Sequence, residues 1–145
     1  MITQLFLFLT APSSTIFLEY GLCFMRITIG ILTIAHGYPK IMGGVQTWQF
    51  LGGTMANVGI HFWPVFWGLC AACAEFFGGI ALTLGLGTRI ASLFLIFMMI
   101  IAFLMHWNKK DSFQVYSFSL AMIAIFIGFF IAGSGIYSVD AYLNR

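Results

Sequence analysis

The chain has 145 residues, of which 61% are hydrophobic, 18% aromatic and only 7% charged. A soluble domain carries about a quarter charged residues, so the composition excludes a soluble globular protein and indicates an integral membrane protein in contact with the lipid bilayer. The net charge of +2 provides no strong field for nucleic acid, and no nucleic-acid partner is expected.

The chain begins with a short apolar segment at about 1–11, which Pro12 ends. It is too short to span a bilayer, and we expect it to lie along the membrane surface. The first span is predicted at about 16–36. Gly37 and Pro39 follow, and they predict the end of that helix, because glycine favours a C-cap and proline cannot continue a helix.

The connection after the first span carries aromatic and apolar residues between glycines, so it is not a free polar loop. We expect an interfacial helix at about 44–58; a lid over the mouth of the bundle is the alternative. The three remaining spans are predicted at about 62–84, 88–107 and 113–132. The polar stretch Asn108–Asp111 between the last two must lie in water, and Ser138 is a candidate N-cap for a short C-terminal helix.

The predicted fold is therefore a single all-α membrane domain, 1–145. It is a four-transmembrane-helix antiparallel bundle with an interfacial helix in the first loop. This topology puts the two termini and the turn at 85–87 on one face of the membrane and the two other loops on the opposite face.

Two charged residues lie near the centres of adjacent spans, Arg26 in the first and Glu75 in the second. At about 1.5 Å per residue they should lie at similar depth. Each alone would cost about 3 kcal/mol in the bilayer centre, so we predict that they form an ion pair. Glu19 and Arg89 lie nearer the face of the termini and are predicted to form a second pair.

Buried ion pairs stabilise a fold poorly, because desolvation consumes much of the Coulomb energy. The predicted Arg26–Glu75 pair therefore favours a role in binding a ligand or relaying protons. A purely structural role, in which the charges fix the register of the helices, is the alternative.

Three histidines lie at span ends on the face opposite the termini, together with Lys40 and Trp107; they are His36, His61 and His106. This shared face predicts a polar pocket for a quinone or another head group, or simply interfacial histidines. A metal site needs its ligands in one small sphere, and the spacing does not provide that, so no metal is expected.

Cys70 and Cys73 have the spacing of a redox motif, and Cys23 could lie at a comparable depth. Within a continuous helix nothing activates these thiols, so we predict reduced cysteines that pack between helices; dithiol chemistry is the alternative. The sequence contains no haem-attachment motif and no Gly-x-Gly-x-x-Gly loop, so no covalent cofactor is expected.

Four short pieces of sequence form an ordered pattern: Arg26 with Gly30 and His36-Gly37-x-x-Lys40; Glu75-Phe76-Phe77-Gly78-Gly79 with Leu84-Gly85-x-x-Thr88-Arg89; Ala102-Phe103-Leu104-x-His106; and Gly133-x-Gly135-x-Tyr137-Ser138-x-Asp140. In this order and spacing they resemble the signatures of the DoxX family, over about Glu19 to Arg145. The cysteines, His61 and the N-terminal segment are not part of that pattern and are particular to this chain.

The resemblance implies a four-helix, multi-pass protein of the bacterial inner membrane. Relatives in the family include membrane subunits of thiosulfate:quinone oxidoreductase and partners of thiol-redox and oxidative-stress proteins. Other membrane or redox protein subunits are therefore the expected partners. The resemblance also implies termini in the cytoplasm, whereas the count of basic residues on the two faces weakly favours the outside; these residues are Lys40, Lys109 and Lys110 against Arg89 and Arg145.

These patterns lead to two functional hypotheses. In the first, the protein is a redox-associated subunit, not catalytic alone, that holds a quinone or small sulfur compound; the expected site residues are Arg26, Glu75, His36, His106 and Lys40. Arg26 would bind an anion or polarise a carbonyl, and Glu75 would hold or relay a proton. In the second, the protein is a non-catalytic scaffold or accessory subunit of a larger membrane complex.

Overall fold

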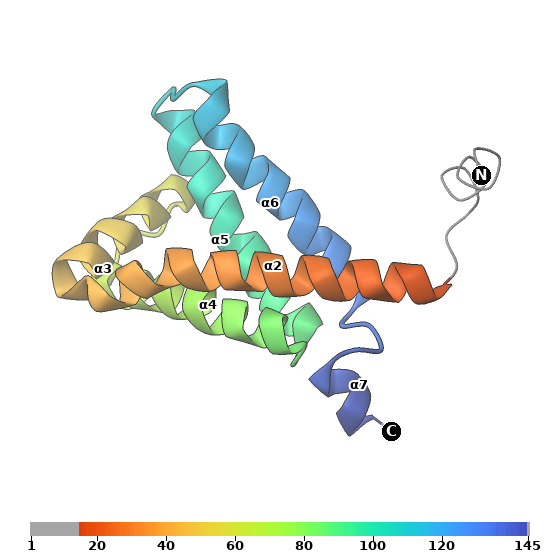
Figure 1. The fold of residues 1–145 in the computed structure, drawn as a ribbon. Coiled ribbons are helices and arrows are strands. Elements are labelled where there is room, and N and C mark those ends of the chain that lie inside the picture. The colour runs from red at the N-terminus through yellow and green to blue at the C-terminus, as the bar shows by residue number, and fades with distance from the viewer. Residues whose placement is uncertain (1–14, 145) are drawn as a thin grey trace.

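The computed structural model describes residues 15–144, which form helices joined by turns, with no strand in this range (Figure 1). The four long helices are α2 (Thr15–Met42), α4 (Pro64–Leu84), α5 (Thr88–Asn108) and α6 (Phe113–Ala132). Each is long and apolar enough to cross a membrane, which confirms the predicted all-α membrane fold. The surface segment expected at about 1–11 lies outside the described residues.

The first helix is longer than the sequence predicts. α2 continues through Gly37 and Pro39 to Met42, six residues past the expected end at 36. Gly37 does not cap the helix; it lies where α2 approaches the backbone of Phe76 on α4. Near the end of α2, the indole Nε1 of Trp48 donates a hydrogen bond of 2.9 Å to the carbonyl of Lys40, which satisfies one of the terminal carbonyl groups that a helix leaves open.

α2 and α4 lie side by side and antiparallel (Figure 1). Gly30 and Gly79 form the closest approach, since a Cβ on Gly79 would lie 2.8 Å from the carbonyl oxygen of Gly30. Small residues allow such contacts between membrane helices, where packing drives association. The neighbouring Gly78 faces Leu95 of α5.

The predicted short helix between the first two spans is present as α3 (Gly44–Gly53) and a 3-10 helix, η1 (Thr54–Val58). α3 packs along the start of α4, where Gly52 meets the carbonyl of Pro64 and Gly68 meets that of Trp48. This packing on both sides of glycine backbones favours a fixed helix over a lid.

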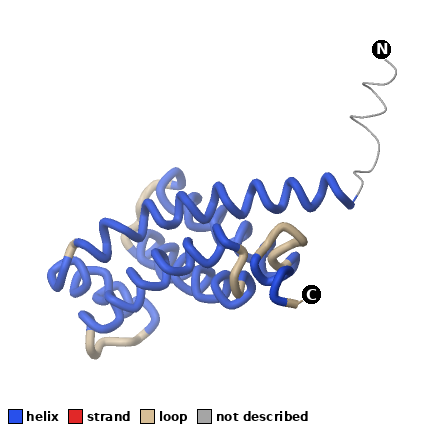
Figure 2. Tube along the Cα trace, turned by 60° about the horizontal axis from the view of Figure 1, so that its bottom comes forward, coloured by secondary structure: helices blue, strands red, loops and turns tan. Residues whose placement is uncertain are grey.

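α5 and α6 form a second antiparallel pair, which is inclined to α2 and α4 in Figure 1. Buried apolar side chains from α4, α5 and α6 form the core; they are Leu82, Ala91, Leu95, Met122, Phe126 and Phe129. Figure 2 shows that the N-terminal end of α2 projects beyond the other long helices. The short helix α7 (Val139–Leu143) follows the loop after α6, and Ser138 caps it by accepting a hydrogen bond from the amide of Ala141, as predicted.

Candidate functional site

The most buried ion pair in the described chain joins α2 to α4. The Nζ atom of Lys40 lies 2.5 Å from both carboxylate oxygens of Glu75. The Glu75 side chain is only 6% exposed, whereas that of Lys40 is 31% exposed. One turn before Lys40, Gly37 brings the α2 backbone against Phe76. The carboxylate is thus enclosed between two helices, and its cationic partner reaches the surface.

This geometry corrects the predicted pairing of Glu75 with Arg26. Lys40 lies 14 residues after Arg26, which is about 21 Å further along the helix axis. The prediction placed Arg26 at the centre of a span that ended at 36. In the structure α2 runs on to Met42 and is staggered along α4, with Gly30 against Gly79 and Gly37 against Phe76. The last turn of α2, and not its middle, therefore lies at the depth of Glu75.

Arg26 is 1% exposed and bonds to carbonyl groups instead of a carboxylate. Its Nη1 donates to the carbonyl of Leu82 at 3.1 Å, and its Nη2 donates to that of Tyr137 at 2.6 Å. Nη2 also lies 3.8 Å from the sulfur of Cys23, and Nε has no hydrogen-bond partner among the described residues. Arg26 therefore ties α2 to the end of α4 and to the segment after α6.

The predicted Glu19–Arg89 pair is also not formed in residues 15–144. Glu19 Oε2 accepts a hydrogen bond of 2.8 Å from the amide of Ile136, and Arg89 Nη2 donates to the carbonyl of Ile131 at 3.4 Å. Both side chains lie at the expected end of the bundle. The last turn of α6 offers a carbonyl to Arg89, and the segment after α6 offers an amide to Glu19, so neither side chain needs the other.

Asp140 has a role that sequence reasoning missed. Its carboxylate accepts hydrogen bonds from the amides of Gly87 (2.8 Å) and Thr88 (3.3 Å), and its own amide donates to the carbonyl of Gly85 at 3.0 Å. An acid is favourable at a helix N-terminus, where free amides and the helix dipole attract negative charge. The first turn of α5 contains no acidic residue of its own. This lack could have indicated that an acid from elsewhere in the chain caps the helix.

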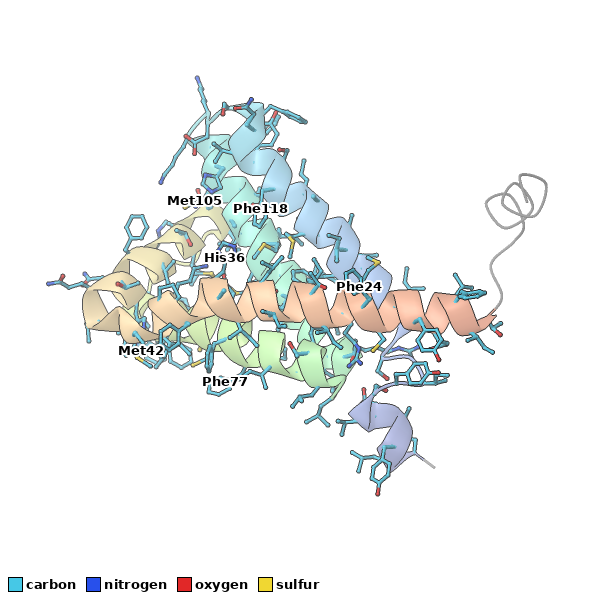
Figure 3. The ribbon with its side chains drawn as sticks, viewed as in Figure 1. Phe24, His36, Met42, Phe77, Met105 and Phe118 are labelled. Carbon is cyan, nitrogen blue, oxygen red and sulfur yellow. The ribbon has the colours of Figure 1, made fainter. Side chains whose placement is uncertain are left out.

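The three histidines do not form one cluster. His36 lies exposed on α2, with its ring centroid 5.9 Å from that of Phe118 on α6 (Figure 3). His106, near the end of α5, places Nδ1 2.7 Å from Asp111 Oδ2, and His61 is exposed in the loop before α4. Across residues 15–144, no group of three His, Cys, Asp or Glu side chains is arranged to hold a metal ion.

All three cysteines are free thiols. Cys70 and Cys73 line a groove of about 710 Å³ between α4 and α5, whose other lining residues include Trp67, Phe77 and Met98. An apolar groove provides no charge that would activate a thiol. The thiols are unbonded, but Cys70 is exposed in the groove and does not pack between helices as predicted.

The DoxX family model matches residues 21–107. The chain belongs to the DoxX family. It is 33% identical over 130 residues to the inner membrane protein YqjF of Escherichia coli, with 88% of this chain and 95% of that protein covered. It is 26% identical over 127 residues to "Putative oxidoreductase CatD" of Bacillus subtilis, with 88% and 90% covered. No solved structure matches the chain.

This DoxX protein is a multi-pass protein of the bacterial inner membrane. Its signature residues gather at two places in the fold. Arg26, Gly85, Tyr137 and Asp140 meet where the segment after α6 joins the α4–α5 turn. At the other end of α2, Gly37 and Lys40 meet Glu75 and Phe76. The first place is closed by packing and hydrogen bonds, and the second contains the accessible ion pair.

Proposed function

We propose that this DoxX protein is a redox-associated membrane subunit that binds a quinone or a small sulfur compound beside Lys40 and Glu75. The observation that carries the proposal is an enclosed carboxylate whose cationic partner is partly exposed. Ionisable groups inside a membrane are expensive and usually mark a site of binding or proton transfer. An apolar pair of similar volume would hold the helices as well or better.

The residues around the pair have the chemistry that a quinone head group requires. Lys40 can donate a hydrogen bond to a carbonyl oxygen or bind an anion, and Glu75 can hold a proton. His36 lies four residues before Lys40 and so near it on the surface of α2. His106 lies apart from this pair at the end of α5, where Asp111 holds its Nδ1 and leaves Nε2 to exchange protons with water.

The electrons for such a reaction would come from a partner redox subunit, since the sequence contains no covalent cofactor motif. The name of the Bacillus subtilis relative supports an association with redox chemistry. Within this proposal the protein positions the quinone and supplies its protons, and it is not an enzyme on its own.

A second candidate is a non-catalytic accessory subunit of a larger membrane complex. The packing of Arg26 favours it, because this most deeply buried charge is bonded to two carbonyl groups. None of the three pockets described in the structure is lined by Arg26, Lys40 or Glu75. We therefore assign Arg26 a role in holding the fold together, which either function would need.

For the orientation, we propose that the two termini lie in the cytoplasm, as the family resemblance implies. Fusions of reporter proteins to the C-terminus test this directly. A reporter active only in the cytoplasm should be active there, and activity of a periplasmic reporter would reverse the assignment.

Photolabelling tests the proposed function. Membranes that contain the protein are treated with a photoreactive short-chain quinone, and the labelled peptides are mapped by mass spectrometry. The proposal predicts labels in the peptides that contain His36, Lys40 and Glu75, and their loss when unlabelled quinone is added. A photoreactive lipid without a quinone head group is the control. Labelling that the unlabelled quinone does not displace would contradict the proposal and favour the accessory subunit.

A further inference from the structure

A polar pocket lies at the turn between α5 and α6. Its volume is about 490 Å³, and its lining residues are Trp107, Asn108, Lys110, Asp111 and Tyr116. We propose that this pocket binds the head group of a zwitterionic phospholipid. The phosphate lies at Lys110, and the ammonium group lies at Asp111 beside the aromatic side chains of Trp107 and Tyr116.

The backbone of Lys110 supports a built site. Lys110 has a φ of 56°, a conformation that non-glycine residues adopt at a cost. The amide of Lys110 donates to the carbonyl of Trp107 at 3.0 Å, and that of Asp111 donates to the carbonyl of His106 at 3.1 Å. This is the Schellman pattern, in which glycine is the usual residue at the left-handed position. A lysine in that position makes the turn less stable than a glycine would, but it places a cation at the rim of the pocket.

The charged groups of Lys110 and Asp111 both remain available to bind a ligand. No hydrogen bond or ion pair is formed by the Lys110 ammonium group within residues 15–144, and its side chain is exposed. Asp111 bonds to His106 through Oδ2, which leaves Oδ1 as an acceptor. A cation and a carboxylate on adjacent residues match the phosphate and the ammonium group of one zwitterionic head group.

Two aromatic rings provide the remaining wall. The ring centroids of Trp107 and Tyr116 are 5.5 Å apart, with the planes at 73°. The two rings thus contact each other edge to face, and a ring face that lines the pocket beside a carboxylate attracts an ammonium group by cation–π and charge interactions.

The position of the pocket favours a membrane lipid over a soluble ligand. It lies where α5 leaves the apolar segment, and tryptophan, tyrosine and lysine gather at that level of a membrane protein because one end of each side chain is apolar. An anionic phospholipid would meet Lys110 equally well, but it would place no ammonium group against Asp111. The pocket should therefore prefer the zwitterionic lipid.

Native mass spectrometry of the purified full chain tests the assignment. The probes are phosphatidylethanolamine and phosphatidylglycerol with identical acyl chains, and free phosphoethanolamine as competitor. Lys110→Asn removes the charge but keeps a residue that tolerates a left-handed backbone. The matched control is Lys109→Asn, since Lys109 lies 5.8 Å from the ring centroid of Phe50 and does not line the pocket.

We expect the wild-type protein to bind phosphatidylethanolamine about fivefold more tightly than phosphatidylglycerol, and Lys110→Asn to lose about fivefold or more of this binding. Lys109→Asn should keep the wild-type affinity, and neither variant should melt below the wild-type temperature. Equal affinity for the two lipids, or equal losses in the two variants, would overturn the proposal. Displacement of the lipid by free phosphoethanolamine would overturn the assignment to a membrane lipid.

Discussion

The ammonium group of Lys40 lies 2.5 Å from each carboxylate oxygen of Glu75, across the interface between α2 and α4. Removing only the lysine leaves a carboxylate buried without its cation. We expect Lys40→Met to destabilise the protein by about 3–5 kcal/mol, and the double variant Lys40→Met with Glu75→Gln to recover much of that loss. Thermal unfolding in detergent measures both. A double variant no more stable than Lys40→Met would show that the pair does not act as a unit.

The contact between Gly30 and Gly79 fixes how closely α2 approaches α4. A Cβ on Gly79 would lie 2.8 Å from the carbonyl oxygen of Gly30 and from the side chain of Ile34. Gly79→Leu should therefore lower the free energy of unfolding by about 1–3 kcal/mol through overpacking. Folded yield and melting temperature in detergent report the loss. Gly21→Leu is the control, because a Cβ on Gly21 of α2 would meet no atom within 4 Å. If both variants fold equally well, the close crossing is not required.

Asp140 connects the C-terminal segment to the start of α5. Asp140→Ala should lower the stability by about 1 kcal/mol, the usual loss when a helix cap is removed. Asp140→Asn keeps an oxygen that can accept from one amide, so it should lose less. Melting temperatures of the two variants test this order. A larger loss in Asp140→Asn than in Asp140→Ala would argue against the capping role.

The pKa of Tyr137 is raised above its ordinary value of 10.0. The chief cause is a hydrogen bond with the Tyr20 side chain, and the second is the loss of solvent around the phenol. The two rings stack with centroids 5.0 Å apart. A raised pKa favours the protonated phenol in the folded state, so this stabilising contribution is complete below pH 10 and is lost as the pH rises through the raised pKa. The difference in alkaline absorbance titration between wild type and Tyr137→Phe isolates the group. Its midpoint should exceed 10 and fall in Tyr20→Phe; a midpoint at the ordinary value would contradict the contact.

Much of the fold could be predicted from the sequence, because length and hydropathy determine which segments can cross a membrane. The ranges expected for α4, α5 and α6 agree with the structure within two residues at each end. The end of α2 could not be predicted from Gly37 and Pro39, since those residues favour a helix end only when no neighbour supports the helix. The backbone of α4 and the indole of Trp48 provide that support here.

The predicted Arg26–Glu75 pair was wrong because of how α2 is staggered along α4. Both residues were assigned to the right helix, but Gly30 lies against Gly79 and Gly37 against Phe76, so Glu75 faces a residue 14 positions after Arg26. The backbone carbonyls and amides that the segment after Ala132 offers to side chains could not be predicted from the sequence. Those groups, at Tyr137 and Ile136, are the partners that Arg26 and Glu19 use.

Equilibrium binding of a short-chain quinone to the purified protein in lipid nanodiscs tests the central proposal most directly. The wild type is compared with the double variant Lys40→Met and Glu75→Gln, which removes both charges without leaving one unpaired. We predict a folded double variant that binds the quinone at least about tenfold more weakly, which corresponds to the loss of one charged hydrogen bond. A folded double variant with the wild-type affinity would contradict a quinone site at Lys40 and Glu75.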